Sequence, residues 1–498
     1  MKTRLEHLLK VMKINLKQGH IWGFFLALGI LILYGNLTSP RLFQYDPGYY
    51  WDLRTMFLDS RRDFHLLNYH DWIYQLRGYL FPLFLLIAEW VIDVFTPDWL
   101  VDDYLTVVIF NAFQISLAGW FFIPKILSFL TGKDINISLR VFILGILAFF
   151  WRGFLYLPYS DFPAFFCFLV AVLFFGGAIQ STGWRSIGLA FLAGGTATSA
   201  YLIRPVYLPA WIVLVTGLIL LSSKSHAWFH KLVNSGAFLL ATILLVIPQS
   251  MINKIHYGID TPFTSPGLYG YQVTVGFLLQ RFDVNMDKGV YPYSSIRFID
   301  PQGVRILERE ERSLAAMVIT GAGIDGENVM DYLFSPRELV DLWLNYPLDI
   351  VTIYFRHFFN GLNLMFPSVY VWDVYHVDIV SMWLNYTILF GLLFLFDIRT
   401  LFARDIPFSS FVLLAWLLPV LTSIPGAVEA RYFLPLHVLL EACFVWMMAD
   451  LRTMKAKIEQ FGVFRMLFLY VMFVLMAFSL SGLILTTVPQ ANLLLTPR

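Results

Sequence analysis

Apolar stretches long enough, or nearly long enough, to cross a bilayer follow one another along the whole chain. A spanning helix needs about 20 mostly apolar residues, so the pattern predicts an all-α bundle of about 11–13 transmembrane helices. The predicted spans lie near residues 21–34, 104–124, 141–158, 162–179, 187–203, 205–221, 232–250, 379–396, 406–424, 430–449 and 464–487. Two further stretches, 79–95 and 348–366, carry charged residues, and we expect interfacial or incompletely crossing helices there.

The distribution of basic residues predicts the orientation of these helices. Five cations precede the first span, which has no cleavage site after it and therefore reads as a retained helix with a cytoplasmic N-terminus: Lys2, Arg4, Lys10, Lys13 and Lys17. Alternation of the spans then places the basic segments 125–140, 224–231, 399–404 and 452–457 on the cytoplasmic side and the C-terminus outside. We expect a multi-pass protein of the plasma (inner) membrane of a bacterium.

Two long segments then lie on the extracytoplasmic face of what we expect to be one integral-membrane domain, residues 1–498. The first covers residues 38–103. Its apolar and charged residues fall on opposite sides of a helix, which is typical of a helix lying in the membrane interface. The apolar side comprises Tyr50, Leu53, Met56, Phe57 and Phe64, and the charged side comprises Asp52, Asp59, Arg62 and Asp63.

The second outer segment covers residues 251–378. Ser335 and Glu338 have the spacing of a capping box, with Pro336 at the first helical position, so a helix is predicted from about 336 to the Asn345-Tyr346-Pro347 stop. Proline-containing pairs predict loops elsewhere in the segment, at Thr261-Pro262, Ser265-Pro266 and Asp300-Pro301.

Composition excludes several classes of protein. Hydrophobic residues make up 58% of the chain, charged residues 14%, and the mean hydropathy is +0.67, which excludes an ordinary soluble domain. A net charge of +1 without a basic face gives no reason to expect nucleic-acid binding. Cys167 and Cys443 both lie in apolar runs and indicate neither redox chemistry nor metal binding.

Asp46 is the strongest candidate for chemistry. It lies just beyond the first span, before a Pro47-Gly48 turn that would hold its carboxylate at the mouth of the bundle. A carboxylate there can serve as the general base that activates an acceptor hydroxyl, because partial desolvation raises its pKa. The bland alternative is a solvated turn aspartate.

Further charged residues fall at the same predicted membrane face. Asp161 begins a span, where it can cap the helix. Arg204 separates two apolar runs with no polar loop, so its partner is a lipid phosphate, an internal carboxylate such as Asp161, or the headgroup region. Arg77 and Arg431 add two cations. If Glu429 and Arg431 lie on a helix, we expect each to face a different partner, since side chains two apart on a helix diverge.

In their order along the chain these motifs resemble the GT-C superfamily of polyprenyl-phosphate-sugar-dependent glycosyltransferases, which includes protein O-mannosyltransferases and the lipid A aminoarabinose transferase. The matching positions are Asp46 with Tyr49 and Tyr50, the run from Arg77 to Pro82, the run from Ser160 to Ala164, Arg204-Pro205, and the run from Glu429 to Pro435. The resemblance implies inverting transfer of a sugar, with Asp46 as base and a cavity open to the extracytoplasmic side.

The resemblance also implies partners: a polyprenyl-phosphate-linked sugar as donor, a glycan, lipid or protein as acceptor, and the membrane lipid itself. Clustered arginines would stabilise the departing phosphate, so we assign Arg77, Arg204 and Arg431 to the donor, with Asp161, Glu429, Tyr49 and Tyr50 beside them. Many relatives carry two adjacent acidic residues where this chain has Asp46-Pro47, so neither a metal nor another cofactor is predicted.

Two other functions remain open from the sequence. A transporter or flippase for lipid-linked glycans also has many helices and intramembrane charges, although it usually shows two related halves, which this chain lacks. A polysaccharide polymerase or ligase would use a diphosphate-linked oligosaccharide on the same membrane face. The sequence separates this last class poorly from a monophosphate-dependent transferase.

Overall fold

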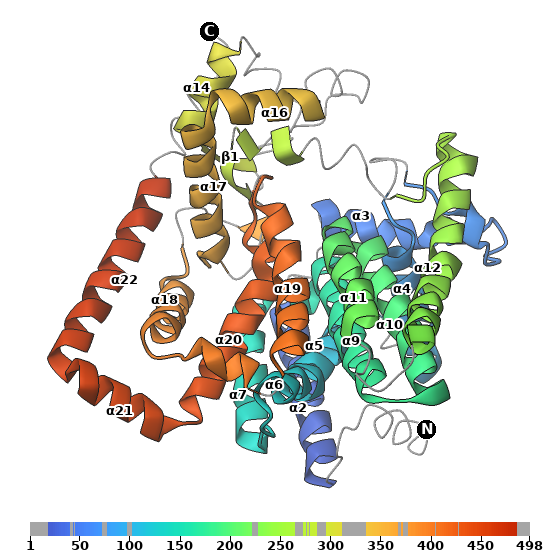
Figure 1. The fold of residues 1–498 in the computed structure, drawn as a ribbon. Coiled ribbons are helices and arrows are strands. Elements are labelled where there is room, and N and C mark those ends of the chain that lie inside the picture. The colour runs from blue at the N-terminus through green and yellow to red at the C-terminus, as the bar shows by residue number, and fades with distance from the viewer. Residues whose placement is uncertain are drawn as a thin grey trace. The chain divides into compact units, whose positions relative to one another are not determined.

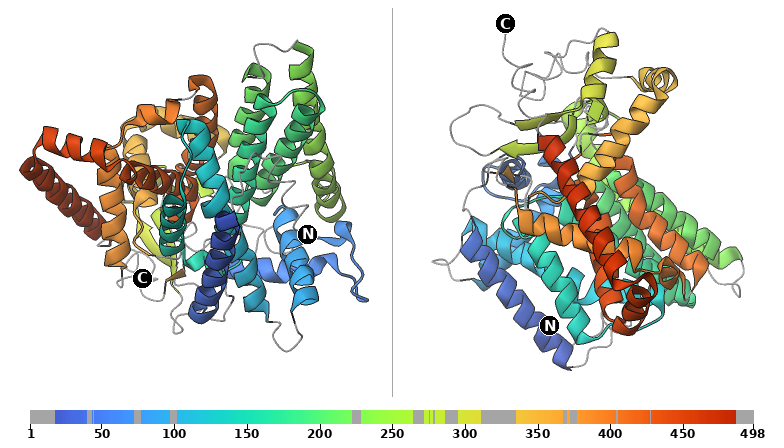
Figure 2. Two further views of the ribbon diagram at one scale, coloured as in Figure 1. Left: turned by 90° about the horizontal axis from the view of Figure 1, so that it is seen from below. Right: turned by 90° about the vertical axis from the view of Figure 1, so that its left-hand side faces the viewer.

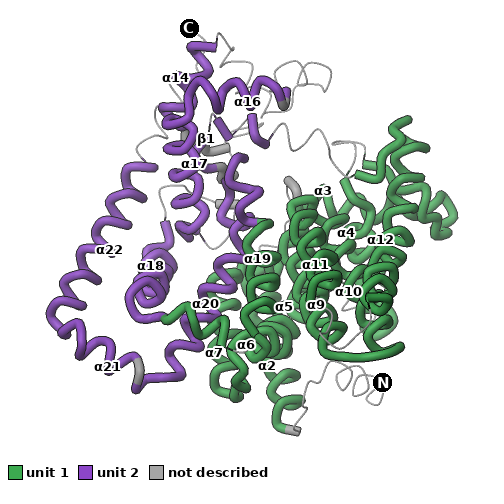
Figure 3. Tube along the Cα trace, in the orientation of Figure 1, with its two compact units in different colours: residues 1–265, 397–419 green, residues 266–396, 420–498 purple. Residues whose placement is uncertain are grey.

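The structure is a computed structural model, and its described residues fall into two compact units (Figure 3). It describes residues 18–39, 43, 45–71, 77–96, 102–221, 228–263, 272–274, 276–277, 279–285, 295–310, 335–366, 370–371, 377–403, 405–426 and 428–485. Unit 1 comprises Met1–Ser265 and Asp397–Pro419, and unit 2 comprises Pro266–Phe396 and Val420–Arg498. Each unit is described by itself below.

The helices and strands that the structure describes in unit 1 are all helices (Figure 1). Its elements are α2 (Gln18–Thr38), α3 (Tyr45–Leu53), η1 (Arg54–Phe57), η2 (Leu66–Asn68), α4 (Leu80–Phe95), α5 (Asp103–Leu117), η3 (Ala118–Phe122), α6 (Ile123–Thr131), α7 (Ile137–Phe150), α8 (Gly153–Tyr156), α9 (Asp161–Gln180), α10 (Gly183–Ile203), η4 (Pro205–Tyr207), α11 (Leu208–Leu221), α12 (Trp228–Tyr257) and η6 (Ile398–Phe402), and α19 (Ile406–Ser423) starts in it.

Unit 2 combines helices with one small sheet. Its helices are α14 (Pro301–Arg309), α16 (Pro336–Asn345), α17 (Pro347–Leu362), α18 (Ile379–Phe394), η7 (Ala430–Phe433), α20 (Leu434–Met448), α21 (Leu451–Phe461) and α22 (Val463–Leu485). The strands β1 (Leu279–Asn285), β2 (Ser295–Ile299) and β3 (Tyr370–Val371) form a sheet in the order β2-β1-β3, in which β1 pairs antiparallel with β2 and parallel with β3. The sequence analysis did not predict this sheet.

The predicted membrane helices are confirmed. Within the described part of the chain, eight helices are long and apolar enough to cross a membrane: Gly19–Thr38, Asp103–Thr131, Asp161–Gln180, Gly183–Ile203, Trp228–Tyr257, Ile406–Ser423, Ala430–Met448 and Val463–Leu485. Three shorter apolar helices, Ile137–Phe150, Pro205–Leu221 and Ile379–Phe394, coincide with the remaining predicted spans. The protein is therefore a multi-pass, all-α integral membrane protein.

Close approach of small residues holds the helices of unit 1 together. Helices α9, α10, α11 and α12 run side by side, and α10 packs against both α9 and α12 (Figures 1 and 2). At Gly194 of α10, a Cβ atom would lie 2.2 Å from the carbonyl oxygen of Phe238 in α12. Only glycine permits this approach, as is usual where membrane helices associate without a hydrophobic driving force.

Hydrogen bonds between helices complete the same interface. Asn234 Nδ2 of α12 donates to Ser186 Oγ of α10 over 2.8 Å, and Thr198 Oγ1 of α10 donates to Thr242 Oγ1 of α12 over 2.9 Å. Such side chains satisfy one another where water is absent. Both ends of the α10–α12 contact are thus fixed in register.

The first outer segment is helical for a shorter distance than predicted. Helix α3 and η1 end at Phe57, and Leu58 then pairs with Phe64 in an isolated antiparallel bridge, so the predicted continuation of the helix to Phe64 is wrong. The physical reason is turn chemistry: Asp59 Oδ1 accepts hydrogen bonds from the backbone N–H groups of Arg61 and Asp63. These bonds lower the pKa of Asp59, the one from Asp63 most strongly.

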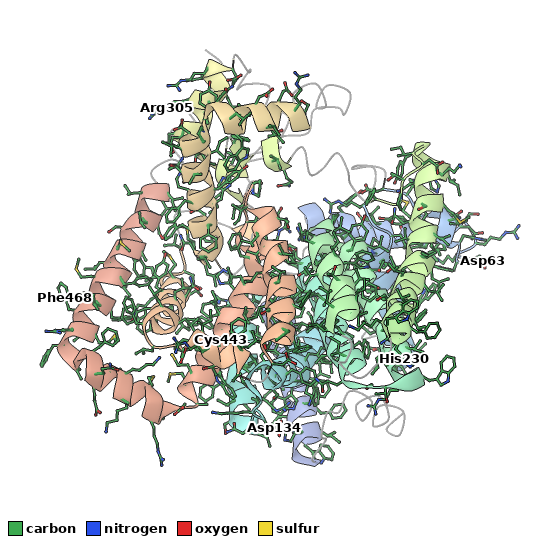
Figure 4. The ribbon with its side chains drawn as sticks, viewed as in Figure 1. Asp63, Asp134, His230, Arg305, Cys443 and Phe468 are labelled. Atoms are coloured by element: carbon green, nitrogen blue, oxygen red, sulfur yellow. The ribbon has the colours of Figure 1, made fainter. Side chains whose placement is uncertain are left out.

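The burial of the helical part of this segment agrees with the amphipathic pattern. Leu53 and Phe57 are fully buried, whereas Asp52 is exposed. Phe64, predicted on the buried side, is 43% exposed because it lies beyond the helix. Asp63, in the turn, points away from the helices of unit 1 (Figure 4).

Two predictions for the second outer segment can be compared with unit 2. Helix α16 runs from Pro336 to Asn345 with both hydrogen bonds of the Ser335–Glu338 capping box, as predicted. Asp300-Pro301 was predicted as a loop, but Asp300 is the N-cap of α14, and its carboxylate accepts from the N–H groups of Gln302 and Gly303. Thr261-Pro262 lies in a loop after α12, and Ser265-Pro266 lies outside the described residues.

Replacing Gly194 tests the packing of α10 on α12. Gly194→Ala should lower the free energy of unfolding by about 1–3 kcal/mol, because the added methyl group overlaps the Phe238 backbone. The neighbouring Gly195→Ala is the matched control, since its Cβ would meet only the Ala241 Cβ at 3.9 Å. Thermal unfolding in detergent compares the two variants, and equal midpoints would contradict the predicted clash.

Candidate functional site

Three of the predicted site residues, Tyr49, Tyr50 and Arg77, lie together in unit 1. Arg77 precedes α4, and its guanidinium carbon lies 4.6 Å from the ring centroid of Tyr50 and 5.3 Å from that of Tyr49, both in α3. Cations are attracted to the faces of aromatic rings at such distances. The two tyrosines therefore hold the Arg77 cation against α3.

Helix α3 owes its position to close local contacts. The predicted Pro47-Gly48 turn is wrong, because both residues lie in helix α3. A Cβ atom at Gly48 would lie 2.8 Å from the Phe43 carbonyl oxygen, so this close approach requires glycine. The Tyr50 ring packs edge-on against Phe81 of α4, with centroids 4.9 Å apart. Its hydroxyl accepts a hydrogen bond of 3.2 Å from Ser160 Oγ, which brings the start of α9 to the same cluster.

Asp161 and Arg204 form an ion pair next to this cluster. Arg204 Nη1 donates to Asp161 Oδ1, and the Asp161 side chain is 4% exposed. Of the three partners considered from the sequence for Arg204, the structure shows the internal carboxylate. Because Asp161 is the first residue of α9 and Arg204 follows the last residue of α10, the pair also places these two helix ends on one face of unit 1.

Asp46 lies in the first turn of α3, one helical turn before Tyr49 and Tyr50. Its side chain lies outside the described residues. The backbone therefore places the predicted base on the helix that carries both tyrosines.

Sequence reasoning missed two residues of this cluster, Tyr69 and Asp71. Asp71 is fully buried, and its Oδ2 lies 3.9 Å from Arg77 Nε. Its backbone is fixed by α12, since the Asp71 N–H donates to the Tyr257 hydroxyl and that hydroxyl donates to the Asp71 carbonyl oxygen over 3.3 Å. No motif marks Asp71 in the sequence, because the contact with Arg77 forms only when the segment folds back on α12.

Buried amides of α12 anchor the chain just after Arg77. Gln249 Oε1 accepts from the Tyr79 N–H over 3.0 Å, and Gln249 Nε2 donates to Asn253 Oδ1 over 2.8 Å. The Tyr79 hydroxyl donates to the Leu245 carbonyl oxygen over 3.1 Å. These bonds set the entry of α4 and hence the position of Arg77.

A second ion pair ties η1 to α4. Arg54 donates to both carboxylate oxygens of Glu89, over 2.8 and 3.1 Å, and its guanidinium carbon lies 3.7 Å from the centroid of a Trp51 ring. Glu89 is one of the charges that marked residues 79–95 as an unusual apolar stretch. This charge is thus neutralised within the first outer segment.

Glu429 and Arg431 belong to unit 2, and there the two side chains pair with each other. Arg431 Nε lies 2.6 Å from Glu429 Oε2, and Arg431 Nη2 donates to Glu429 Oε1 over 3.1 Å. The prediction assumed a helix, but Glu429 is extended, with φ −113° and ψ 142°, ahead of η7. The Tyr432 hydroxyl also donates to Glu429 Oε1 over 2.6 Å, so the carboxylate holds both neighbours.

The part of the chain that the structure describes contains no group of three or more His, Cys, Asp or Glu side chains placed to hold a metal ion. Cys167 and Cys443 are free and buried, the latter in unit 2 (Figure 4). The polar chemistry of the described site is therefore that of arginine, carboxylate and tyrosine.

No family model matches the chain, and no curated protein matches it.

A double-mutant cycle tests the ion pair in unit 1. Asp161→Asn should lower the free energy of unfolding by about 3 kcal/mol, because it leaves the Arg204 charge poorly compensated in a largely buried place. The double variant Asp161→Asn/Arg204→Gln should lose less than the sum of the two single variants. Thermal or denaturant unfolding in detergent measures all four proteins, and strict additivity would contradict a direct interaction.

Proposed function

We propose that this protein is a GT-C-type membrane glycosyltransferase that moves a sugar from a polyprenyl-phosphate donor to an extracytoplasmic glycan, lipid or protein acceptor, with inversion at the anomeric carbon. The observation that carries the proposal is the convergence of Tyr49, Tyr50, Arg77, Asp161 and Arg204 in unit 1. They come from separate stretches of the chain and were selected from the sequence alone.

The chemistry of this cluster suits a phosphate leaving group. In the proposed reaction the acceptor hydroxyl oxygen attacks the anomeric carbon, Asp46 takes the hydroxyl proton, and the bond from carbon to the phosphate oxygen breaks. Polyprenyl phosphate then departs with the added negative charge. We assign Arg77 and Arg204 to the stabilisation of that charge, since guanidinium groups are strong, oriented donors to phosphate.

The internal carboxylates do not remove the arginines from this role. A guanidinium group carries five N–H donors, and one carboxylate engages only some of them. Asp161 holds Arg204 in a fixed orientation, which reduces the ordering that substrate binding would otherwise require. In unit 2, Glu429 holds Arg431 in the same manner.

The experiment that tests the proposal is transfer of radiolabelled sugar from a panel of polyprenyl-monophosphate sugars by the purified protein in lipid, with acceptor extract present. Asp46→Asn should reduce turnover by about 10²-fold or more, as expected for removal of a general base. Asp52→Asn, at an exposed position of α3, is the matched control and should retain activity.

Each alternative has its own signature in this assay. Wild-type protein that releases no polyprenyl phosphate from any donor would overturn the monophosphate-dependent reaction and favour the transporter or the diphosphate-dependent enzyme. Near-normal turnover by Asp46→Asn would end the assignment of Asp46 as base.

Arg204→Ala tests whether Arg204 binds the donor or has only a structural role. The variant should weaken donor binding by about tenfold or more and leave acceptor binding nearly unchanged, because only the donor carries the phosphate. Separate titrations of donor and acceptor measure this. Unchanged donor affinity would assign Arg204 a structural role.

A further inference from the structure

Tyr69 has a buried hydroxyl that the described structure leaves unused. It follows η2, and its ring stacks on Phe57 with centroids 4.9 Å apart and an interplanar angle of 19°. The side chain is fully buried, and its hydroxyl has no hydrogen-bond partner among the described residues. A buried hydroxyl without a partner is unfavourable and therefore points to a group that the protein binds there.

Tyr69 lies two residues before Asp71, whose carboxylate is 3.9 Å from Arg77 Nε, so the chain brings its side chain to the Arg77 cluster. Burial raises the pKa of Tyr69 well above its usual value; the Tyr257 and Tyr50 hydroxyls act in the same direction, and the Arg77 cation opposes them. Tyr257 contacts the Asp71 backbone, and the Tyr50 ring contacts Arg77, so both tyrosines belong to the cluster described above. Tyr69 is thus a donor available within the same polar cluster.

Asp71 complements Tyr69 by orienting Arg77. The backbone of Asp71 is held on both sides by the Tyr257 hydroxyl, and the carboxylate faces Arg77 Nε at 3.9 Å. The rings of Tyr49 and Tyr50 hold the same guanidinium group by cation–π contacts. Three neighbours therefore restrict the directions in which Arg77 can present its N–H groups.

We propose that the Tyr69 hydroxyl and Arg77 together bind one phosphate group, and that Asp71 is the positioning residue that orients Arg77 toward it. A phosphate oxygen accepts the hydrogen bonds of both donors, so the buried hydroxyl gains its partner when the ligand binds. The identification of this phosphate as that of a polyprenyl carrier rests on the proposed function. The anion site itself does not.

Binding measurements on the full chain in phosphatidylcholine nanodiscs test the proposal. The probes are undecaprenyl phosphate, undecaprenol, phosphatidylglycerol and inorganic phosphate. Tyr69→Phe should weaken undecaprenyl phosphate binding by about tenfold, the value of one hydrogen bond to a charged group, and leave undecaprenol binding unchanged. Tyr79→Phe is the matched control, because that hydroxyl is already bonded to a backbone carbonyl group.

The positioning role of Asp71 has a separate readout. Asp71→Asn should weaken undecaprenyl phosphate binding by about fivefold with undecaprenol unaffected, and Asp71→Glu should recover part of the loss because it restores the charge beside Arg77. A merely structural role would weaken both ligands alike and would not be rescued by glutamate. That result would overturn the assignment of Asp71.

The outcomes distinguish this inference from the proposed function. If Tyr69→Phe binds undecaprenyl phosphate as tightly as wild type while Arg77→Ala loses this binding, the assignment of Tyr69 is wrong and the proposed function stands. If wild type binds phosphatidylglycerol or inorganic phosphate as tightly as undecaprenyl phosphate, the anion site stands and its assignment to a polyprenyl donor is wrong. If wild type binds none of the phosphate probes, both proposals are overturned.

Discussion

The ion pair between Asp161 and Arg204 determines how the candidate site of unit 1 is built. An arginine between two apolar helices has few water molecules to solvate it, and its charge is expensive unless a partner compensates it. Asp161 supplies that partner from the start of the neighbouring helix. The pair brings the adjoining ends of α9 and α10 together, and Ser160 then reaches Tyr50 in α3.

The same requirement explains the rest of the polar interior. Arg54 is neutralised by Glu89, and Arg77 lies beside Asp71, so these two cations of the first outer segment lie against internal carboxylates. In unit 2, Arg431 is paired with Glu429. Arg281 of β1, also in unit 2, donates to the carbonyl oxygens of Asn360 and Asn363 at the end of α17. Each arrangement satisfies a buried charge locally.

In unit 2, polar side chains in and just after α17 connect this helix to its neighbours. Asn363 follows α17; its Nδ2 donates to Ser481 Oγ of α22 over 2.9 Å, and its Oδ1 accepts from the Tyr386 hydroxyl of α18 over 2.7 Å. His357 of α17 lies between the carbonyl oxygens of Leu279 and Ile424, with ring nitrogens 3.1 and 2.6 Å away. One short helix is thereby joined to β1 and to two apolar helices, which fixes the small sheet on the membrane part of this unit.

The sequence by itself determined that this is a multi-pass membrane protein and where its apolar helices lie, because the lack of water in a bilayer demands long apolar runs. The same constraint made the charged residues Asp161 and Arg204 conspicuous in the sequence. Tertiary structure alone decided which charges meet. Asp71 and Tyr69 carry no local signal, because Asp71 is held by Tyr257 of α12 and the Tyr69 ring stacks on Phe57 of η1. The pairing of Glu429 with Arg431 depends on an extended backbone at Glu429. The sheet of unit 2 was also decided by non-local pairing, because β1 joins β3 across 85 intervening positions of the chain, from Val284 to Tyr370.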